Sequence, residues 1–241
     1  MSALLRLLQL SDPALPIGGY AHSAGLETYV QSGVVHDRAG AEDFVRSMLR
    51  MGIHYTDAAL AALAYKAAET GDTDEVKRLD QLCEAVKLPR EVREASRKLG
   101  VRLMKVFGGQ MEVPLGQEKA IVGQEKVGDQ EKVIAGQVKV VGLRHYSVVF
   151  GYCAAMLGIG LREALTGYYY NAAAGMVTNC VKLIPIGQQD GQAILFGLQP
   201  LIMELVEKSL VPERELIGMC STGFDISSMQ HEQLYSRLYM S

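Results

Sequence analysis

The chain has 241 residues, of which 49% are hydrophobic and 21% are charged, and its formal net charge at pH 7 is −3. This length suits one large domain or two small ones with a substantial core, and this composition excludes a chain that is disordered throughout. A slightly acidic chain has no overall positive field for nucleic acid or an anionic membrane. We therefore expect neither as a partner.

The cysteines and the N-terminal residues indicate the compartment. The four cysteines, Cys83, Cys153, Cys180 and Cys220, never approach a Cys-x-x-Cys spacing. We predict that each is a small buried thiol. The leucine-rich opening carries a single basic residue and soon meets a proline, so it does not have the pattern of a signal peptide. A cytoplasmic protein is the expectation.

The stretch from Asp12 to Glu27 combines prolines, glycines and polar side chains, which suits neither a strand nor the middle of a helix. Proline disfavours the α region in the residue before it, and glycine lets the backbone turn where a side chain would clash. We therefore predict backbone-shaping roles for four residues: Pro16, Gly18, Gly19 and Gly25. The neighbouring polar residues form a candidate site: Tyr20, His22, Ser23 and Glu27.

Apolar residues recur at helical spacing along most of the chain. Asp37 and the segment Gly71–Thr73 offer N-caps, and Pro89 suits the first turn of a helix. The predicted helices cover residues 20–32, 38–49, 57–69, 75–87, 89–107, 145–157, 161–183 and 190–206, and a short element follows at 212–219. No run of alternating strands appears outside the segment 111–142, so the predicted fold class is all-α.

The predicted helix 161–183 is nearly uncharged and rich in small residues, which also raises the possibility of a membrane span. Polar residues lie in or beside it: Arg162, Glu163, Asn171, Asn179 and Lys182. No second apolar stretch of this length accompanies it. We therefore predict a helix buried between other helices, and no membrane contact.

The segment 111–142 differs from the rest of the chain. Gln-Glu-Lys occurs at 117–119, 124–126 and 130–132, and glycines that disfavour helix separate these copies. We predict an irregular inserted surface segment of low complexity. The whole prediction is one domain over residues 1–241, a helical bundle of about eight to ten helices with this insert and a C-terminal docking tail at 221–241.

The sequence offers little support for catalysis. It lacks a phosphate-binding Gly-x-x-x-x-Gly-Lys-Ser/Thr string, and its five histidines are isolated from one another and from cysteines. The segment 22–25, His-Ser-Ala-Gly, matches the back half of a nucleophile elbow, but Ala21 replaces the front glycine and no strand precedes it. We therefore assign no catalytic residue and no metal ligand, and a serine hydrolase using Ser23 remains only an unfavoured alternative.

The last residues of the chain are unusually rich in binding side chains. His231, Tyr235 and Arg237 lie within seven residues of one another. Tyrosine and arginine dominate binding hot spots because they offer large contact area and several hydrogen bonds. We predict that this tail docks on the body of the protein or on a partner.

Several blocks together resemble the UreF family of urease accessory proteins. They cover residues 8–27, 96–100, 146–158, 181–192 and 225–239. These blocks stand in the family's order and span nearly the whole chain, so the resemblance is specific. The segment 111–142 departs from it, because it is longer and more repetitive than the family's usual connection.

The resemblance implies an all-helical, non-enzymatic scaffold that forms a homodimer and binds the accessory protein UreD, also called UreH. That complex recruits the GTPase UreG and delivers nickel to apo-urease. No cofactor of its own is implied, since nickel is handled by the complex. The partner-binding residues implied are Tyr20, His22, Ser23, Glu27, Lys182, Gln189, Asp190, Gln192, His231, Tyr235 and Arg237.

Within that set, we expect the tail to dock UreD/UreH and the N-terminal stretch to face UreG. The competing interpretation is a helical adaptor that regulates some other GTPase.

Overall fold

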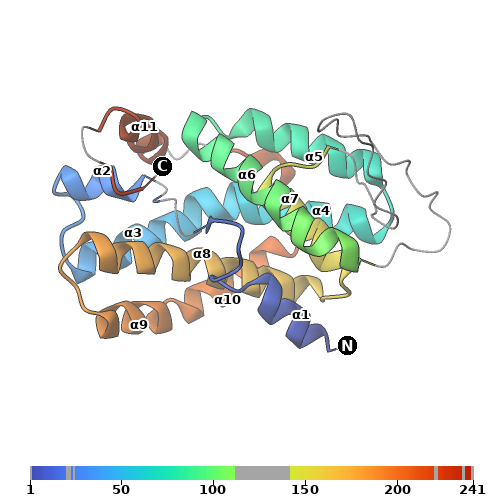
Figure 1. The fold of residues 1–241 in the computed structure, drawn as a ribbon, viewed down its shortest axis with the longest axis horizontal. Coiled ribbons are helices and arrows are strands. Elements are labelled where there is room, and N and C mark those ends of the chain that lie inside the picture. The colour runs from blue at the N-terminus through green and yellow to red at the C-terminus, as the bar shows by residue number, and fades with distance from the viewer. Residues whose placement is uncertain are drawn as a thin grey trace, which may run out of the picture.

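The structure is a computed structural model that describes residues 2–19, 23, 25–111, 142–219, 222–234 and 237–239. These residues form helices and no strand, which confirms the all-α prediction (Figure 1). The predicted insert at 111–142 lies, except for its two end residues, outside the described residues.

The described residues form a series of helices along the chain. The α-helices are α1 (Ala3–Leu10), α2 (Leu26–Gln31), α3 (Arg38–Met48), α4 (Ala59–Glu69), α5 (Thr73–Val86), α6 (Arg90–Phe107), α7 (Tyr146–Met156), α8 (Leu161–Leu183), α9 (Gln188–Gly197), α10 (Gln199–Ser209) and α11 (Thr222–His231). A π-helix, η2 (Leu49–Ala58), joins α3 to α4, and 3-10 turns occupy η3 (Gly108–Gln110) and η4 (Arg214–Leu216).

The predicted helix starts rest on local chemistry, and the structure confirms them. Asp37 accepts a hydrogen bond from the Gly40 N–H at 2.8 Å, and Asp72 accepts one from the Glu75 N–H at 2.9 Å. These side chains satisfy backbone donors that have no partner inside the helix. Pro89 directly precedes α6, where a missing N–H costs nothing.

Two predicted helices were wrong in their extent. The helix predicted from residue 20 begins only at Leu26, because Gly25 has a left-handed φ of 79°. The helix predicted over 190–206 is divided into α9 and α10. Pro200 lies in the first turn of α10 and cannot donate the hydrogen bond that would continue α9.

The π-helix η2 carries no signal in the sequence, and it makes α3, η2 and α4 one continuous rod from Arg38 to Glu69. Asp57 within it pairs with the buried Lys87, their Oδ1 and Nζ atoms lying 2.8 Å apart. A buried ion pair of this kind fixes the direction in which η2 faces the end of α5.

The core consists of two apolar clusters that share α4 and α8. Ala164 and Tyr168 of α8 belong to the cluster around α5, α6 and α7, while Leu165 and Tyr169 belong to the cluster around α3, α9 and α10. A helix with apolar residues all round is expected between others, which confirms the burial predicted for α8. No described helix is long and apolar enough to cross a membrane.

Three of the four cysteines are described, and all three are buried and free, as predicted. Burial raises the pKa of the Cys83 thiol and of the Cys180 thiol to about 12. Both side chains are therefore neutral, unreactive parts of the core. Cys220 lies outside the described residues.

Candidate functional site

Two stretches that the sequence singled out, one near each end of the chain, meet at one end of the molecule. Figure 1 shows α2, α11 and the C-terminus together there, beyond the start of α6. The Thr28 hydroxyl of α2 donates to the Ser227 carbonyl of α11 at 2.9 Å. At Gly25 an added Cβ would lie 2.8 Å from the Ser228 Oγ, so only glycine allows α11 to approach the start of α2 this closely.

Glu27 holds the residues that follow α11, which are called the tail from here on. It lies in the first turn of α2 and is only 4% exposed. Its Oε1 accepts a hydrogen bond from the Leu238 N–H at 2.7 Å, and its Oε2 accepts one from the Tyr239 N–H at 3.3 Å. A single carboxylate therefore holds two consecutive backbone amides of the tail, about 210 residues further along the chain.

His231, at the end of α11, is fully buried between two carboxylates. Its Nε2 lies 3.1 Å from Glu27 Oε2, and its Nδ1 lies 2.8 Å from Glu91 Oε2 on α6. An ionised carboxylate accepts hydrogen bonds and cannot donate them, so both ring nitrogens must carry protons to make both contacts. The arrangement joins α2, α6 and α11 through one imidazole ring.

Arg237 completes the arrangement. Its Nη1 donates to Glu91 Oε1 at 3.0 Å, on the oxygen that His231 leaves free. The Arg237 side chain is 40% exposed, so this ion pair is partly screened by water and worth little by itself. The four residues Glu27, Glu91, His231 and Arg237 are called the tail cluster below.

The backbone turn at residues 15–18 is held by Arg102 of α6 and not by the tail cluster. Leu15 and Ile17 are buried, and the Arg102 guanidinium of α6 donates to the Ile17 carbonyl at 2.9 Å. Gly18 has a φ of 88°, and an added Cβ there would overlap the Arg102 guanidinium. Gly19, by contrast, has open space around the position of a Cβ, and Pro16 is exposed.

Most of the remaining predicted partner residues lie away from the tail cluster. Lys182, Gln189 and Gln192 are exposed near the end of α8 and the start of α9. Asp190 accepts a hydrogen bond from Arg38 at 3.1 Å and one from the Gly187 N–H at 3.3 Å, so it serves the start of α9. Ser23 is buried. Three predicted residues, Tyr20, His22 and Tyr235, lie outside the described residues.

Glu91 and Arg102 were not among the residues singled out from the sequence. Both lie on an amphipathic helix among other charged residues, and such residues are ordinarily solvated. Their partners are far away in the sequence, with His231 140 residues beyond Glu91. No local pattern could have identified either residue.

A second buried histidine, His145, stands where the chain enters α7. Its Nδ1 lies 3.2 Å from the Ser96 Oγ, and its Nε2 lies 2.9 Å from Glu84 Oε2. Asp80 accepts hydrogen bonds from the Arg144 and His145 N–H groups at 3.0 and 2.8 Å. Burial lowers the pKa of His145, although the hydrogen bond to Glu84 acts in the opposite direction. These residues are called the His145 cluster below.

The Glu84 carboxylate has a strongly lowered pKa. Hydrogen bonds from Arg97 are the largest cause and lower the pKa to about 2. Because the Glu84 side chain is 31% exposed and water screens its charge, the low pKa says more about local charge than about stability. Among the described residues, no group of three or more His, Cys, Asp or Glu side chains is placed to hold a metal ion.

A UreF family model matches residues 35–199 of the chain, which is well over half of its length. This chain belongs to the UreF family of urease accessory proteins. Among its relatives, the urease accessory protein UreF of Actinobacillus pleuropneumoniae serotype 5b is 44% identical over the whole of both chains. The corresponding protein of Haemophilus influenzae strain PittGG is 42% identical over 98% of this chain and 94% of its own length.

A more distant relative, the urease accessory protein UreF of Bacillus sp. strain TB-90, is 32% identical, again over the whole of both chains. The UreF family model ends at residue 199, whereas these full-length matches also include the tail. The names of the family and of these relatives describe an accessory protein of urease.

Proposed function

We propose that this UreF-family chain is a non-catalytic scaffold in urease maturation. In this role it binds UreD/UreH, and the resulting complex recruits the GTPase UreG and delivers nickel to the structural subunits of apo-urease. Nickel is handled by the complex, and the chain needs no cofactor of its own for this work. An accessory protein acts through partners, so the question is which surface meets them.

The observation that carries the proposal is the way in which the tail is displayed. Glu27 holds the backbone of Leu238 and Tyr239, while the Leu238 side chain remains 67% exposed and Arg237 is partly open to solvent. An ordered backbone with exposed apolar and cationic side chains binds at a lower entropic cost than a free chain end. The tail is thus suited to docking a partner.

The division of partners remains part of the proposal. We assign the tail to UreD/UreH and the N-terminal stretch to UreG. Glu27 and His231 are nevertheless in direct contact, so the two surfaces adjoin. Since both side chains are buried, their contribution is to position the surface, whereas Arg237 can touch a partner.

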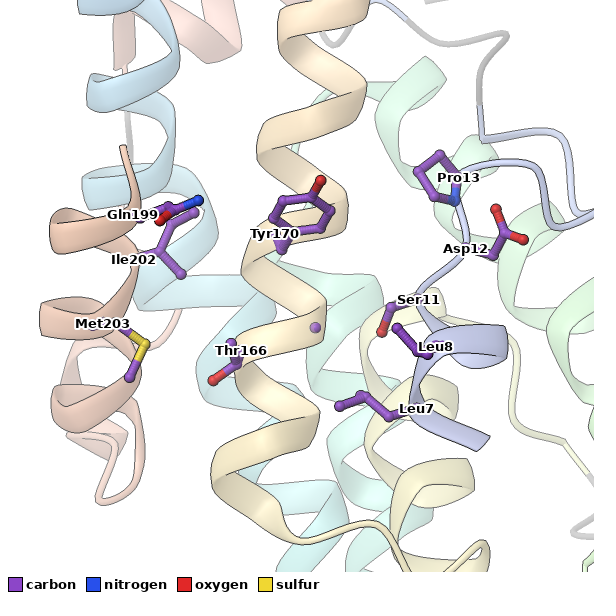
Figure 2. Close-up of a pocket in the computed structure, with 11 residues that line it drawn as sticks. Leu7, Leu8, Ser11, Asp12, Pro13, Thr166, Tyr170, Gln199, Ile202 and Met203 are labelled. Atoms are coloured by element: carbon purple, nitrogen blue, oxygen red, sulfur yellow. The ribbon is translucent and has the colours of Figure 1, made fainter. Parts of the chain in front are cut away.

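A homodimer is also part of the proposal, and a groove along α8 supports it. The groove lies between α1, α8 and α10 (Figure 2), and its walls include Leu7, Leu8, Tyr170, Ile202 and Met203. Its volume is about 630 Å³. Beside it, Leu4, Leu5 and Leu8 of α1 are 61, 61 and 58% exposed. An apolar ridge next to an apolar groove is self-complementary across a two-fold axis, so a second copy is the occupant we propose.

The dimer is tested by light scattering on the purified chain. Leu8→Glu should convert dimer to monomer, because it places a charge between apolar surfaces. Leu88→Glu, at a 51% exposed leucine away from the groove, is the matched control and should remain dimeric. A monomeric native chain, or a dimer unaffected by Leu8→Glu, would remove the second copy from the groove.

The scaffold role is tested by co-purification of the chain with UreD/UreH and UreG, together with urease activity in cells that carry a urease operon. The double substitution Tyr235→Ala with Arg237→Ala should reduce capture of UreD/UreH at least tenfold and abolish urease activation, with urease protein still present. Arg78→Ala, at an exposed arginine on α5, is the matched control. Unimpaired capture by the double variant would overturn the tail assignment. Urease activity that survives deletion of the whole chain would favour an adaptor for another GTPase.

A further inference from the structure

The buried position of His231 has a consequence for how the tail is held. We propose that His231 is a proton-dependent latch: the tail is held on the body while both ring nitrogens carry protons, and it is released when the ring loses one of them. His231 is thus a positioning residue for the tail. The latch goes beyond the scaffold role and does not depend on which protein the tail meets.

The hydrogen bonds provide the first line of support. Both ring nitrogens face carboxylate oxygens, at 2.8 Å to Glu91 and 3.1 Å to Glu27. A neutral imidazole has one N–H donor and one lone pair. After loss of a proton, one of these two contacts would place a lone pair against an oxygen that also carries only lone pairs, which is repulsive.

The charged groups around His231 also support the proposal. Of the elements packed against α11, α2 contributes Glu27 and α6 contributes Glu91, and the tail contributes Arg237. With His231 protonated, two negative groups face two positive ones. Without that proton, Arg237 still serves Glu91, but the buried Glu27 faces a neutral ring and backbone N–H groups among the described residues. A buried carboxylate that loses its cationic partner is strongly destabilised.

Loss of the proton from His231 should affect the tail, because the carboxylates of Glu27 and Glu91 hold the tail as well as the ring. Glu27 accepts from the Leu238 and Tyr239 amides, and Glu91 accepts from Arg237. The body of α11 is held in addition by the Thr28–Ser227 hydrogen bond, which involves no ionisable group. We therefore expect the residues after His231 to detach while α11 itself remains in place.

Hydrogen exchange of the full-length chain measures the latch directly. Protection factors of the Leu238 and Tyr239 amides, corrected for the intrinsic pH dependence of exchange, should fall at least tenfold between about pH 5 and pH 8, the range in which histidine changes charge. Amides of α8 such as Val177, in the core, serve as the internal reference and should not change. Protection at Leu238 and Tyr239 that stays constant over this range would overturn the latch.

Substitutions separate the latch from general loss of structure. In His231→Gln, whose amide offers a single donor nitrogen, both amides should be poorly protected at every pH, without the fall. His36→Gln is the matched control, since this side chain is 71% exposed, and it should behave like the native chain. A fall of the same size in His231→Gln would contradict the proposal.

Glu91→Gln tests whether the charge on His231 controls the tail, because a purely structural role of His231 would leave the midpoint pH of the fall in protection unchanged. Removing one of the two negative charges that hold the proton should move the midpoint of the fall to lower pH by at least about half a pH unit. If His231→Gln does not fold, Glu91→Gln still tests whether His231 is the latch. An unchanged midpoint would mean that the imidazole is not the titrating group. Because all of these measurements use the isolated chain, their failure leaves the scaffold role untouched, and a failed co-purification leaves the latch untouched.

Discussion

Two histidines in the described part of the chain, His231 and His145, are equally buried but have chemically different hydrogen-bond partners. Each is fully buried, and each bonds through both ring nitrogens. His231 faces two carboxylates, whereas His145 faces one carboxylate and the Ser96 hydroxyl. A hydroxyl can donate to a ring nitrogen and a carboxylate cannot, so a neutral ring satisfies the surroundings of His145 and not those of His231.

Because of this difference, the His145 cluster is a permanent contact between helices, whereas the tail cluster is a reversible one. The His145 cluster joins α5, α6 and α7 within the folded body, where Asp80 also holds two consecutive backbone amides. Burial lowers the pKa of His145 and so favours the neutral ring. The tail cluster joins the last residues of the chain to the body and depends on a charge. Burial alone therefore does not distinguish a structural histidine from a regulatory one, whereas its partners do.

The largest effect on stability is expected from a substitution that disturbs the His145 cluster. An added Cβ at Gly100 of α6 would overlap the backbone carbonyl of Arg144, next to His145. Gly100→Ala should therefore lower the free energy of unfolding by about 1–3 kcal/mol, since backbone cannot move aside as a side chain can. Urea unfolding followed by circular dichroism measures it. Gly109→Ala, with nothing within 4 Å of the new Cβ, is the control and should unfold like the native chain.

The next effect is a dependence of stability on pH at His145. Folding lowers the pKa of His145 below the ordinary histidine value of 6.5, so the unfolded chain binds the proton more readily. The stability contributed by a neutral His145 is then present above about pH 6.5 and is lost as the pH falls. Each pH unit between the pKa values of the unfolded and folded chains corresponds to about 1.4 kcal/mol. The tail latch responds in the other direction and weakens as the pH rises.

His145→Gln tests this sign, because a glutamine amide can donate to Glu84 and accept from Ser96 without titrating near neutral pH. The difference in unfolding free energy between the native chain and His145→Gln should change between about pH 7.5 and pH 5.5, the native chain losing more. A constant difference across that interval would show that His145 does not titrate differently in the folded state.

The smallest effect is expected at the uncharged contact between α2 and α11. Thr28→Val removes the hydrogen bond to the Ser227 carbonyl, which is worth roughly 0.5–1.5 kcal/mol. Because α11 lies near the end of the chain, the loss should appear as faster hydrogen exchange within α11 and hardly at all in global unfolding. Thr70→Val, at an exposed hydroxyl that bonds only its own helix end, is the control. A drop in global stability as large as that of Gly100→Ala would mean that α11 is an integral part of the core.

The sequence contained most of the helices and three of the four residues of the tail cluster. Asp37 and Asp72 were recognisable as caps, and α8 has the predicted bounds. Glu27, His231 and Arg237 were singled out for the polar stretches in which they lie, but as separate surfaces for partners. The structure places them in one cluster with Glu91, and the first two are buried. Whether they serve partners as predicted remains a prediction.

The sequence by itself determined the all-α class, the caps and the burial of α8, because helical periodicity and capping involve residues only three or four positions apart. The division of α9 from α10 was missed, although Pro200 marks it in the sequence. Only the tertiary structure decided that a π-helix joins α3 to α4 and that Glu91 on α6 meets His231. Such contacts join residues up to about 200 positions apart, and their charges are paired only when the helices pack. A lone histidine in a sequence does not reveal whether a hydroxyl or a second carboxylate will face it.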